Sequence, residues 1–308
     1  MKTFGYLLMA VMACMTCSCR DEEPLPNPVP PVMEPENPGN PEEPDTGKVY
    51  IGIAPIIENM QEQRAVVENW KEGHCLGVTA AGDVNIPFTF DGRRWKAGKQ
   101  VEVTAEQKVS AYYPYNVQYT DMTAIPVDIT TQEDYMYGEG GVSVEKPSAV
   151  LVMKHALSLV RILIKKNDYT GDGRVDAVTF GGVRLSASMD VTSGKLLPTG
   201  QPGEYKAGGN YTLDDASPVY VEAILMPVGT AEGITVNVHV DGRDFTYALP
   251  PTHVWNPGMI YTYTLNMKSG YNCEVDVDHV PMDEEYWSTF GKTDRIVMRD
   301  CGTDRIYM

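Results

Sequence analysis

Apolar and polar residues alternate in short stretches along most of the chain, and turn-forming residues separate these stretches. Alternation with a period of two places every second side chain on one face of a β-strand. Such stretches cover residues 48–57, 84–95, 99–115, 174–187, 218–228, 233–249 and 259–267. Many short strands with Gly, Pro, Asn and Asp between them predict an all-β protein built from antiparallel β-sandwiches.

Residues 149–166 form the most apolar stretch after residue 47. As a helix they would put apolar and polar residues on every face, whereas β-branched Val150, Val160 and Ile162 favour strands, so we predict one or two buried strands. Residues 59–73 are the best helix candidate. We place a domain boundary near residues 166–172, where the apolar strand gives way to Asn, Asp and Gly.

The predicted organisation therefore has five parts. They are a signal peptide (1–18), a tether rich in proline and acids (19–47), an N-terminal β-sandwich domain (48–168), a C-terminal β-sandwich domain (169–270) and a C-terminal extension (271–308).

The leader has one early lysine and an apolar run of about a dozen residues, which suits a secretory signal and is shorter than the ~20 residues of a membrane-spanning helix. It ends in small residues before a cysteine, which resembles the bacterial lipobox. We predict lipidation at Cys19, with Cys14 as the alternative; an ordinary signal peptide is a third possibility. A lipid on Cys19 would anchor the chain in a membrane.

The tether carries eight acids and one arginine between residues 20 and 45, together with a dense series of prolines. Such a segment cannot bury apolar area and stays extended, at ~3.1 Å per residue. Its first residues, 20–23, resemble the acidic export tag of lipoproteins that face outward from the outer membrane.

The formal net charge of -17 argues against nucleic acid as a partner, because that affinity depends on Lys and Arg. Cys75, Cys273 and Cys301 remain after Cys19. Three thiols in an oxidising compartment leave one unpaired. Cys273 and Cys301 can be partners, but the sequence does not decide this.

No catalytic motif is recognisable, so we predict neither an enzyme nor a cofactor. His155, inside the apolar stretch, is interpreted as a structural histidine. Oxygen-bearing side chains follow the spacing of a calcium loop at Asp168, Thr170, Asp172 and Asp176. Position 12 of such a loop is Thr179 here and lacks the bidentate acid, so we favour a turn between domains over a metal site.

Several motifs, in this order, resemble the fimbrillin family, the subunits and relatives of lipoprotein-derived (type V) pili. Residues 48–57 form a first strand after the tether, and Arg64–Ala65 falls where fimbrillin precursors are cleaved. The remaining motifs are residues 68–78, 90–98, 108–116, 153–165, 223–228 and 255–267, so the resemblance covers residues 48–267. Two departures are Gly73–His74, where many relatives have Gly-Asp, and the continuation to Met308.

The resemblance implies two transthyretin-like β-sandwich domains and an adhesive pilus subunit in the outer membrane, exposed on the cell surface. It implies cleavage after Arg64 and loss of the strand at residues 49–57. Other pilin subunits would be the partners, because the vacated slot would accept a strand from a neighbour, and a host or bacterial surface ligand is a further possible partner. The sequence does not distinguish stalk, anchor and tip roles.

A short repeat near the C-terminus supplies a candidate donor strand. "TDRIVM" at residues 293–298 recurs as "TDRIYM" at residues 303–308. The alternative is a hairpin folded on its own domain. The candidate donor residues are Arg295, Ile296, Val297, Met298, Arg305, Ile306, Tyr307 and Met308.

A second function is also compatible with the sequence. The aromatic clusters at residues 112–115 and 135–138 could form the sugar-stacking surface of a monomeric glycan-binding lipoprotein, or they could fill cross-strand pairs.

Overall fold

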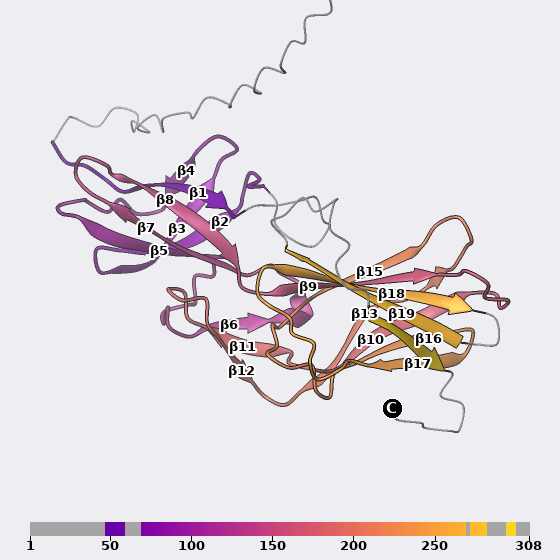
Figure 1. Cartoon of the computed structure of the whole chain (residues 1–308). Coiled ribbons are helices and arrows are strands. Elements are labelled where there is room, and N and C mark those ends of the chain that lie inside the picture. The colour runs from indigo at the N-terminus through magenta and orange to yellow at the C-terminus, as the bar shows by residue number, and fades with distance from the viewer. Residues whose placement is uncertain (1–46, 59–68, 269–271, 282–293, 300–308) are drawn as a thin grey trace, which may run out of the picture. The chain divides into compact units, whose positions relative to one another are not determined.

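The computed structural model describes residues 47–58, 69–268, 272–281 and 294–299, and for the last two ranges it describes the backbone only (Figure 1). The predictions for the leader, the tether, Cys19 and the Arg64–Ala65 bond lie outside these residues, as does most of the helix predicted at 59–73. Within the described ranges, no helix is long and apolar enough to cross a membrane.

The expectation of an all-β protein is confirmed. The described ranges contain twenty strands in four sheets and a single short 3-10 helix at Ile129–Thr131, which the sequence did not predict. Asp128 caps this turn by accepting a hydrogen bond from the backbone N–H of Thr130 at 2.9 Å.

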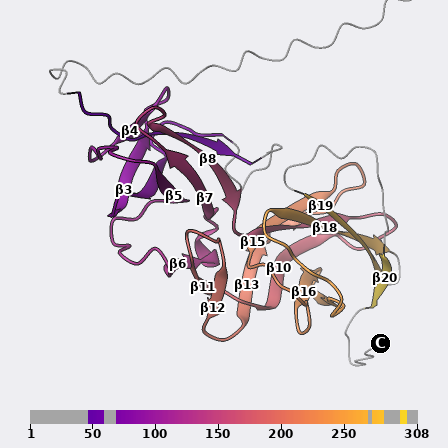
Figure 2. The same ribbon diagram turned by 60° about the vertical axis from the view of Figure 1, so that its left-hand side comes forward.

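Seven strands from the first part of the chain form one sheet, in the order β1-β8-β7-β5-β2-β3-β4 (Figures 1 and 2). Neighbours are antiparallel except β1 and β8, which are parallel. The strands are β1 (Gly52–Ile57), β2 (Cys75–Ala80), β3 (Asp83–Phe90), β4 (Trp95–Ala97), β5 (Gln107–Tyr113), β7 (Met136–Val142) and β8 (Ser148–His155). A turn at Asp91 and Gly92 joins β3 to β4, and the Asp91 carboxylate accepts hydrogen bonds from the N–H groups of Arg93 and Arg94.

The other three sheets are built mostly from the second part of the chain. Their orders are β13-β10-β16-β17 with β14 beside β10, β12-β11-β6, and β15-β9-β18-β19-β20. Only β9 and β18 are parallel among these pairs. The strands are β6 (Ile125–Asp128), β9 (Ser158–Lys165), β10 (Arg174–Val183), β11 (Ser186–Met189), β12 (Leu196–Thr199), β13 (Gly203–Gly208), β14 (Tyr211–Thr212), β15 (Val219–Leu225), β16 (Thr235–Val240), β17 (Arg243–Ala248), β18 (Met259–Lys268), β19 (Asn272–Pro281) and β20 (Asp294–Arg299).

The apolar stretch at 149–166 is two buried strands, β8 and β9, as expected, but the two strands belong to different sheets. The change of sheet falls at Ala156 and Leu157, about ten residues before the predicted boundary. Buried side chains also form two clusters, but Ile125 and Tyr135, which precede Ala156, belong to the same cluster as Ile162. One hydrophobic cluster includes Leu76, Val109 and Leu151, and the other extends through Ile162 and Val178. The division into two domains stays a prediction.

Strand β8 is attached to β7 at one end only. The register pairs are Met136 with His155 and Tyr137 with Lys154. Farther along, β7 has glycines where β8 passes close by. A Cβ atom on Gly138 would lie 2.5 Å from the Val152 carbonyl oxygen. Strand β8 therefore depends on β1 for most of its strand pairing.

Candidate functional site: the first strand and its slot

Strand β1 buries one face in the hydrophobic cluster that contains Leu76 and Leu151. The side chains of Ile51 and Ile53 are 7% and 8% exposed, Pro55 is buried, and Ile56 is 57% exposed. This alternation is what the sequence pattern at residues 48–57 predicts, because successive side chains of a strand point to opposite faces. The first strand is thus a structural part of the core.

The segment that leads into β1 pairs with residues 101–103. The backbone N–H of Ile51 donates to the Val101 carbonyl at 2.9 Å, and the N–H of Val103 donates to the Val49 carbonyl at 2.7 Å. Lys48 forms an ion pair with Glu102 at 2.9 Å. Both charged groups are exposed, so the pair adds little stability. The two backbone bonds fix where the first strand enters its slot.

From Gly52 onward the partner is β8 on the opposite side. The parallel ladder runs from Gly52 beside Ser148 to Ile57 beside Met153. The N–H of Gly52 donates to the Pro147 carbonyl at 3.0 Å, and the N–H of Glu58 donates to the Met153 carbonyl at 2.9 Å. The first strand is therefore bonded to two different neighbours in succession.

Pro55 lies at a strand position that suits proline, on an edge without a strand partner. Because the N–H groups of Gly52 and Glu58 face β8, the backbone groups of Pro55 face the opposite edge. No described strand pairs with that edge over Gly52–Ile57, so the missing N–H of proline costs no ladder bond. The Pro55 carbonyl does find a donor there: the indole N–H of Trp70 donates to it at 2.9 Å.

Trp70 is held by three other rings from separate elements. Its ring centroid lies 5.1 Å from Trp95 on β4, 5.9 Å from Tyr113 on β5 and 5.9 Å from His74 in the turn before β2, with edge-to-face geometry. Aromatic pairs at such separations favour one orientation. The four half-buried rings, Trp70, His74, Trp95 and Tyr113, are called the aromatic cluster below.

The turn before β2 sets the position of His74 in this cluster. The N–H of His74 donates to the Lys71 carbonyl at 3.0 Å, and Gly73 has a φ of +91°, a value that suits glycine. Burial lowers the pKa of His74, and the nearby positive charge of Lys71 lowers it further. The imidazole is therefore neutral at neutral pH, and the cluster contains no charged ring there.

The candidate donor residues fall in two places. Arg295, Ile296, Val297 and Met298 belong to β20, the last strand in the order of its sheet, where it pairs antiparallel with β19. In this structure the first copy of the repeat is thus paired within its own chain, which is the alternative that the sequence left open. Arg305, Ile306, Tyr307 and Met308 lie outside the described residues.

The candidate calcium ligands are not brought together. Asp168, Thr170 and Asp172 are exposed, and Asp176 pairs with Arg174 on β10 at 3.2 Å. Among the described residues, no three His, Cys, Asp or Glu side chains are grouped so that they could hold a metal ion.

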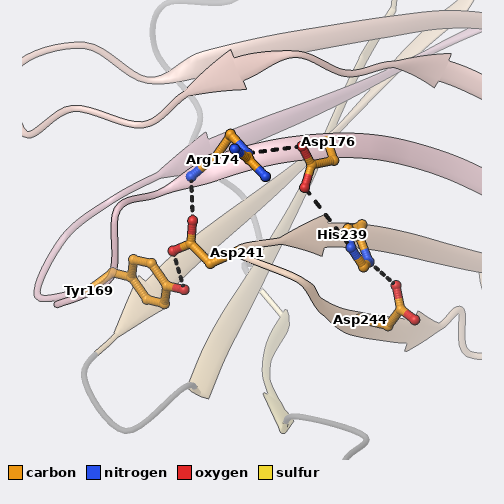
Figure 3. A network of polar contacts seen from close by, with 6 residues as sticks. All are labelled: Tyr169, Arg174, Asp176, His239, Asp241 and Asp244. Carbon is orange, nitrogen blue, oxygen red and sulfur yellow. Dashed lines mark hydrogen bonds and ion pairs between the residues drawn. The ribbon is translucent and has the colours of Figure 1, made fainter.

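The centre of this loop is occupied by Asp241 of the β16–β17 turn (Figure 3). Its carboxylate accepts hydrogen bonds from the Tyr169 hydroxyl and from the N–H groups of Gly173 and Arg174, at 2.8–2.9 Å. A loop whose N–H groups converge on a carboxylate is arranged for an anion, whereas a calcium loop directs oxygens inward. Asp241, far along the chain, could not be assigned to this loop from sequence.

His155 has the structural environment that its place in the apolar stretch indicates. Its Nδ1 atom lies 2.9 Å from Oδ2 of Asp134, and the two side chains are 3% and 1% exposed. The aromatic stretches at 112–115 and 135–138 are partly core: Tyr112 and Tyr135 are buried at 0% and 4% exposure. They therefore do not form one exposed tyrosine surface.

Comparisons with known proteins agree with the fold. A model of the fimbrillin-like family matches residues 64–278. No curated protein matches the sequence closely enough to count as a relative.

Solved structures share the fold, and two of them serve as examples. One is a candidate cell adhesion protein from Bacteroides uniformis, with a TM-score of 0.62 and 19% identity over 77% of this chain and 99% of that chain. Another, from Bacteroides ovatus, has a TM-score of 0.58 and 18% identity over 76% of this chain and 96% of that chain. The family match extends over most of the sequence, and on that ground the chain belongs to the fimbrillin-like family.

Proposed function

We propose that this chain is a structural and adhesive subunit of cell-surface fimbriae that assembles by donor-strand exchange after losing its first strand. Membership of the fimbrillin-like family supports the fimbrial part of this proposal. The similarity to candidate cell adhesion proteins of Bacteroides is compatible with the adhesive part. The exchange mechanism rests on the geometry of β1.

The observation that carries the proposal is that Ile51, Ile53 and Pro55, in the first described strand and just before it, are buried. Removing this strand would uncover the side chains of Ala149, Leu151 and Met153, which are buried in the same cluster. Burial of a large aliphatic side chain contributes about 1.5–3 kcal/mol. An empty slot is therefore unstable enough to favour a replacement.

The vacated slot would also expose backbone groups. Strand β8 would lose the partner that pairs with Gly52–Ile57, and residues 101–103 would lose their bonds to Val49 and Ile51. Unpaired strand edges recruit other strands. A strand from a second subunit would restore these bonds, with alternate side chains filling the core. Because such a contact is head-to-tail, it does not close and produces a filament.

The C-terminal extension is the proposed donor. Strand β20 is the terminal strand of its sheet, so it can leave by breaking one ladder, the one with β19. The second copy of the repeat, at residues 303–308, also ends in an apolar stretch, with Tyr307 in place of Val297.

The lipid on Cys19 and the acidic tether are the proposed route to the outer membrane. The tether would hold the folded part away from the bilayer, where cleavage at Arg64 would release it from the anchor.

An arginine-specific protease tests the proposal. The mature chain without its leader is treated with the protease and separated by gel electrophoresis with and without heating. We expect cleavage at Arg64 followed by a ladder of oligomers that heat dissociates. The Arg64→Ala variant is the control and should remain monomeric. If the cleaved chain stays a monomer and is retarded by polysaccharide in a native gel, the glycan-binding alternative is supported.

A further inference from the structure

We propose that Trp70 is a latch that holds the first strand in its slot after the chain has been cut at Arg64. By latch we mean the hydrogen bond from the Trp70 indole N–H to the Pro55 carbonyl, together with the rings that orient the indole. This inference rests on the proposed function and adds a step to it, because cleavage alone would then not empty the slot.

The latch joins the two sides of the proposed cut. Pro55 precedes Arg64 and Trp70 follows it. After hydrolysis of the Arg64–Ala65 bond, Pro55 would belong to the released fragment and Trp70 to the body that remains. The contact between them is noncovalent and is therefore unaffected by the hydrolysis itself.

The latch acts on the edge of β1 that lacks a strand partner. The β8 side of β1 is held by a ladder, whereas over Gly52–Ile57 the opposite edge has no described strand beside it. There the Pro55 carbonyl would otherwise have no donor from a neighbouring strand. The Trp70 indole supplies one, so loss of the indole N–H removes a bond specific to the occupant of the slot.

Residues outside the first strand orient the indole N–H of Trp70 before a strand occupies the slot. Trp95, Tyr113 and His74 contact the Trp70 ring and come from β4, β5 and the turn before β2. None of them is part of β1, so these three ring contacts remain when the first strand leaves. A preorganised donor loses little conformational freedom when an occupant arrives.

The Trp70 indole bonds a backbone carbonyl and contacts no particular side chain through this bond. The bond therefore does not restrict the sequence of the strand that occupies the slot. Any extended segment that runs parallel to β8 and brings a carbonyl to the position of the Pro55 carbonyl could accept it. A residue other than proline at that position would leave its N–H on the open edge. A strand from a second copy of the chain would place alternate carbonyl groups on the open edge, and the Trp70 indole would bond one of them.

The test uses the mature chain with residues 60–66 replaced by the recognition sequence of a site-specific protease. The cut then does not depend on whether Arg64 is a natural site. Release of the cut N-terminal fragment is followed by native mass spectrometry, with an excess of a synthetic peptide of residues 47–58 to prevent rebinding.

We expect Trp70→Phe, which keeps an aromatic ring but removes the donor, to accelerate release about fivefold to tenfold. Tyr220→Phe on β15 is the control, because Tyr220 is 57% exposed and lies outside the aromatic cluster. Its release rate should stay within about twofold of the parent. Equal rates for Trp70→Phe and the parent, or equal acceleration by both variants, would overturn the latch.

A second measurement needs no substitution at Trp70. In an NMR spectrum of the cut protein, the indole N–H resonance of Trp70 should shift when a peptide that lacks residues 55–58 displaces the N-terminal fragment. Such a peptide has no Pro55 carbonyl to accept the bond. The buried indole of Trp255, which donates to the Tyr263 hydroxyl at 2.9 Å, should not shift. An unchanged Trp70 resonance would contradict the proposal.

The outcomes separate the latch from fimbrial assembly. Faster release from Trp70→Phe without any oligomer would leave the latch in place and count against strand exchange. Oligomers that form equally fast from the parent and from the Trp70→Phe variant would support exchange and reject the latch.

Discussion

At the residue scale, two histidine–aspartate pairs show that burial decides how much the same contact contributes to stability. His155 lies 2.9 Å from Asp134, with both side chains almost fully buried. His239 lies 2.6 Å from Asp244, with side chains 35% and 57% exposed. The shorter distance does not make the second pair contribute more to stability, because water competes for polar groups that are exposed.

We predict that Asp134→Ala lowers the free energy of unfolding by about 1–3 kcal/mol, because it removes the hydrogen-bond partner of a buried His155 nitrogen. Asp244→Ala should cost less than about 1 kcal/mol. Urea denaturation of both variants, monitored by circular dichroism, measures the difference. Equal losses for the two variants would show that burial does not separate the pairs.

Asp241 gives the loop between β9 and β10 a dependence on pH (Figure 3). Burial alone would raise its pKa, but the N–H groups of Gly173 and Arg174, the Tyr169 hydroxyl and the Arg174 charge outweigh it, and the pKa is lowered. A lowered pKa in the folded state means that the unfolded chain binds the proton more readily. The stability from this carboxylate is therefore present above the unfolded pKa of about 3.9 and is lost as the pH falls below it.

For the Asp241→Asn variant we predict a loss of about 1–2 kcal/mol near neutral pH, since the loop N–H groups lose a charged acceptor. The difference from the parent should shrink as the pH falls below about 4, where the parent loses the same contribution. Urea denaturation across this pH range measures it. A difference that stays constant with pH would mean that the Asp241 charge does not stabilise the loop.

At the element scale, the first strand depends on how β8 is held. Glycines of β7 let β8 approach: a Cβ on Gly140 would lie 2.5 Å from the Val150 carbonyl oxygen. At neighbouring Gly141 an added Cβ would lie 3.8 Å from its nearest neighbour, the Gln107 carbonyl oxygen. The two adjacent glycines therefore differ in the space around them.

The substitution Gly140→Ala should therefore destabilise the protein by about 1–3 kcal/mol, because backbone atoms must move apart. At Gly141 the same change should be neutral or slightly stabilising, since alanine restricts the unfolded chain. Thermal unfolding of the two single variants compares them directly. Comparable losses at both positions would indicate that close approach of β8 is not the cause.

At the scale of the whole molecule, the proposed assembly requires an anchor that holds the chain until it is cut. The N-terminal segments that would supply it lie outside the described residues, so the anchor stays a prediction from sequence. It depends on Cys19, which would carry the lipid, and on the extended tether between residues 19 and 47.

We expect Cys19→Ala to abolish membrane attachment, because an acyl chain contributes ~0.8 kcal/mol for each buried methylene and the variant has none. Membrane fractionation and metabolic acyl labelling measure this. Cys14→Ala is the matched control and should retain both label and attachment. Acyl label that persists in Cys19→Ala and disappears in Cys14→Ala would move the anchor to the alternative cysteine.

Much of the secondary structure followed from local pattern. The alternation at residues 48–57 predicted β1, and the alternating stretches at residues 84–95 and 233–249 each contribute strands on both sides of an Asp-Gly turn. The site was less predictable. Trp70 belonged to a predicted helix, and the proline within the first strand was the only local sign that one edge of β1 lacks a strand partner. Asp241 and the loop it holds are 68 residues apart at Gly173, beyond the reach of any local pattern.

The sequence by itself determined which residues form strands, that the first of them is apolar on one face, and the family to which the motifs point. These properties are local, because side-chain alternation and turn residues act over a few positions. Only the tertiary structure decided that β1 runs parallel to β8, that residues 101–103 complete its slot, and that Trp70 bonds Pro55. Those contacts join segments that are distant along the chain, and they are selected by the packing of the whole core.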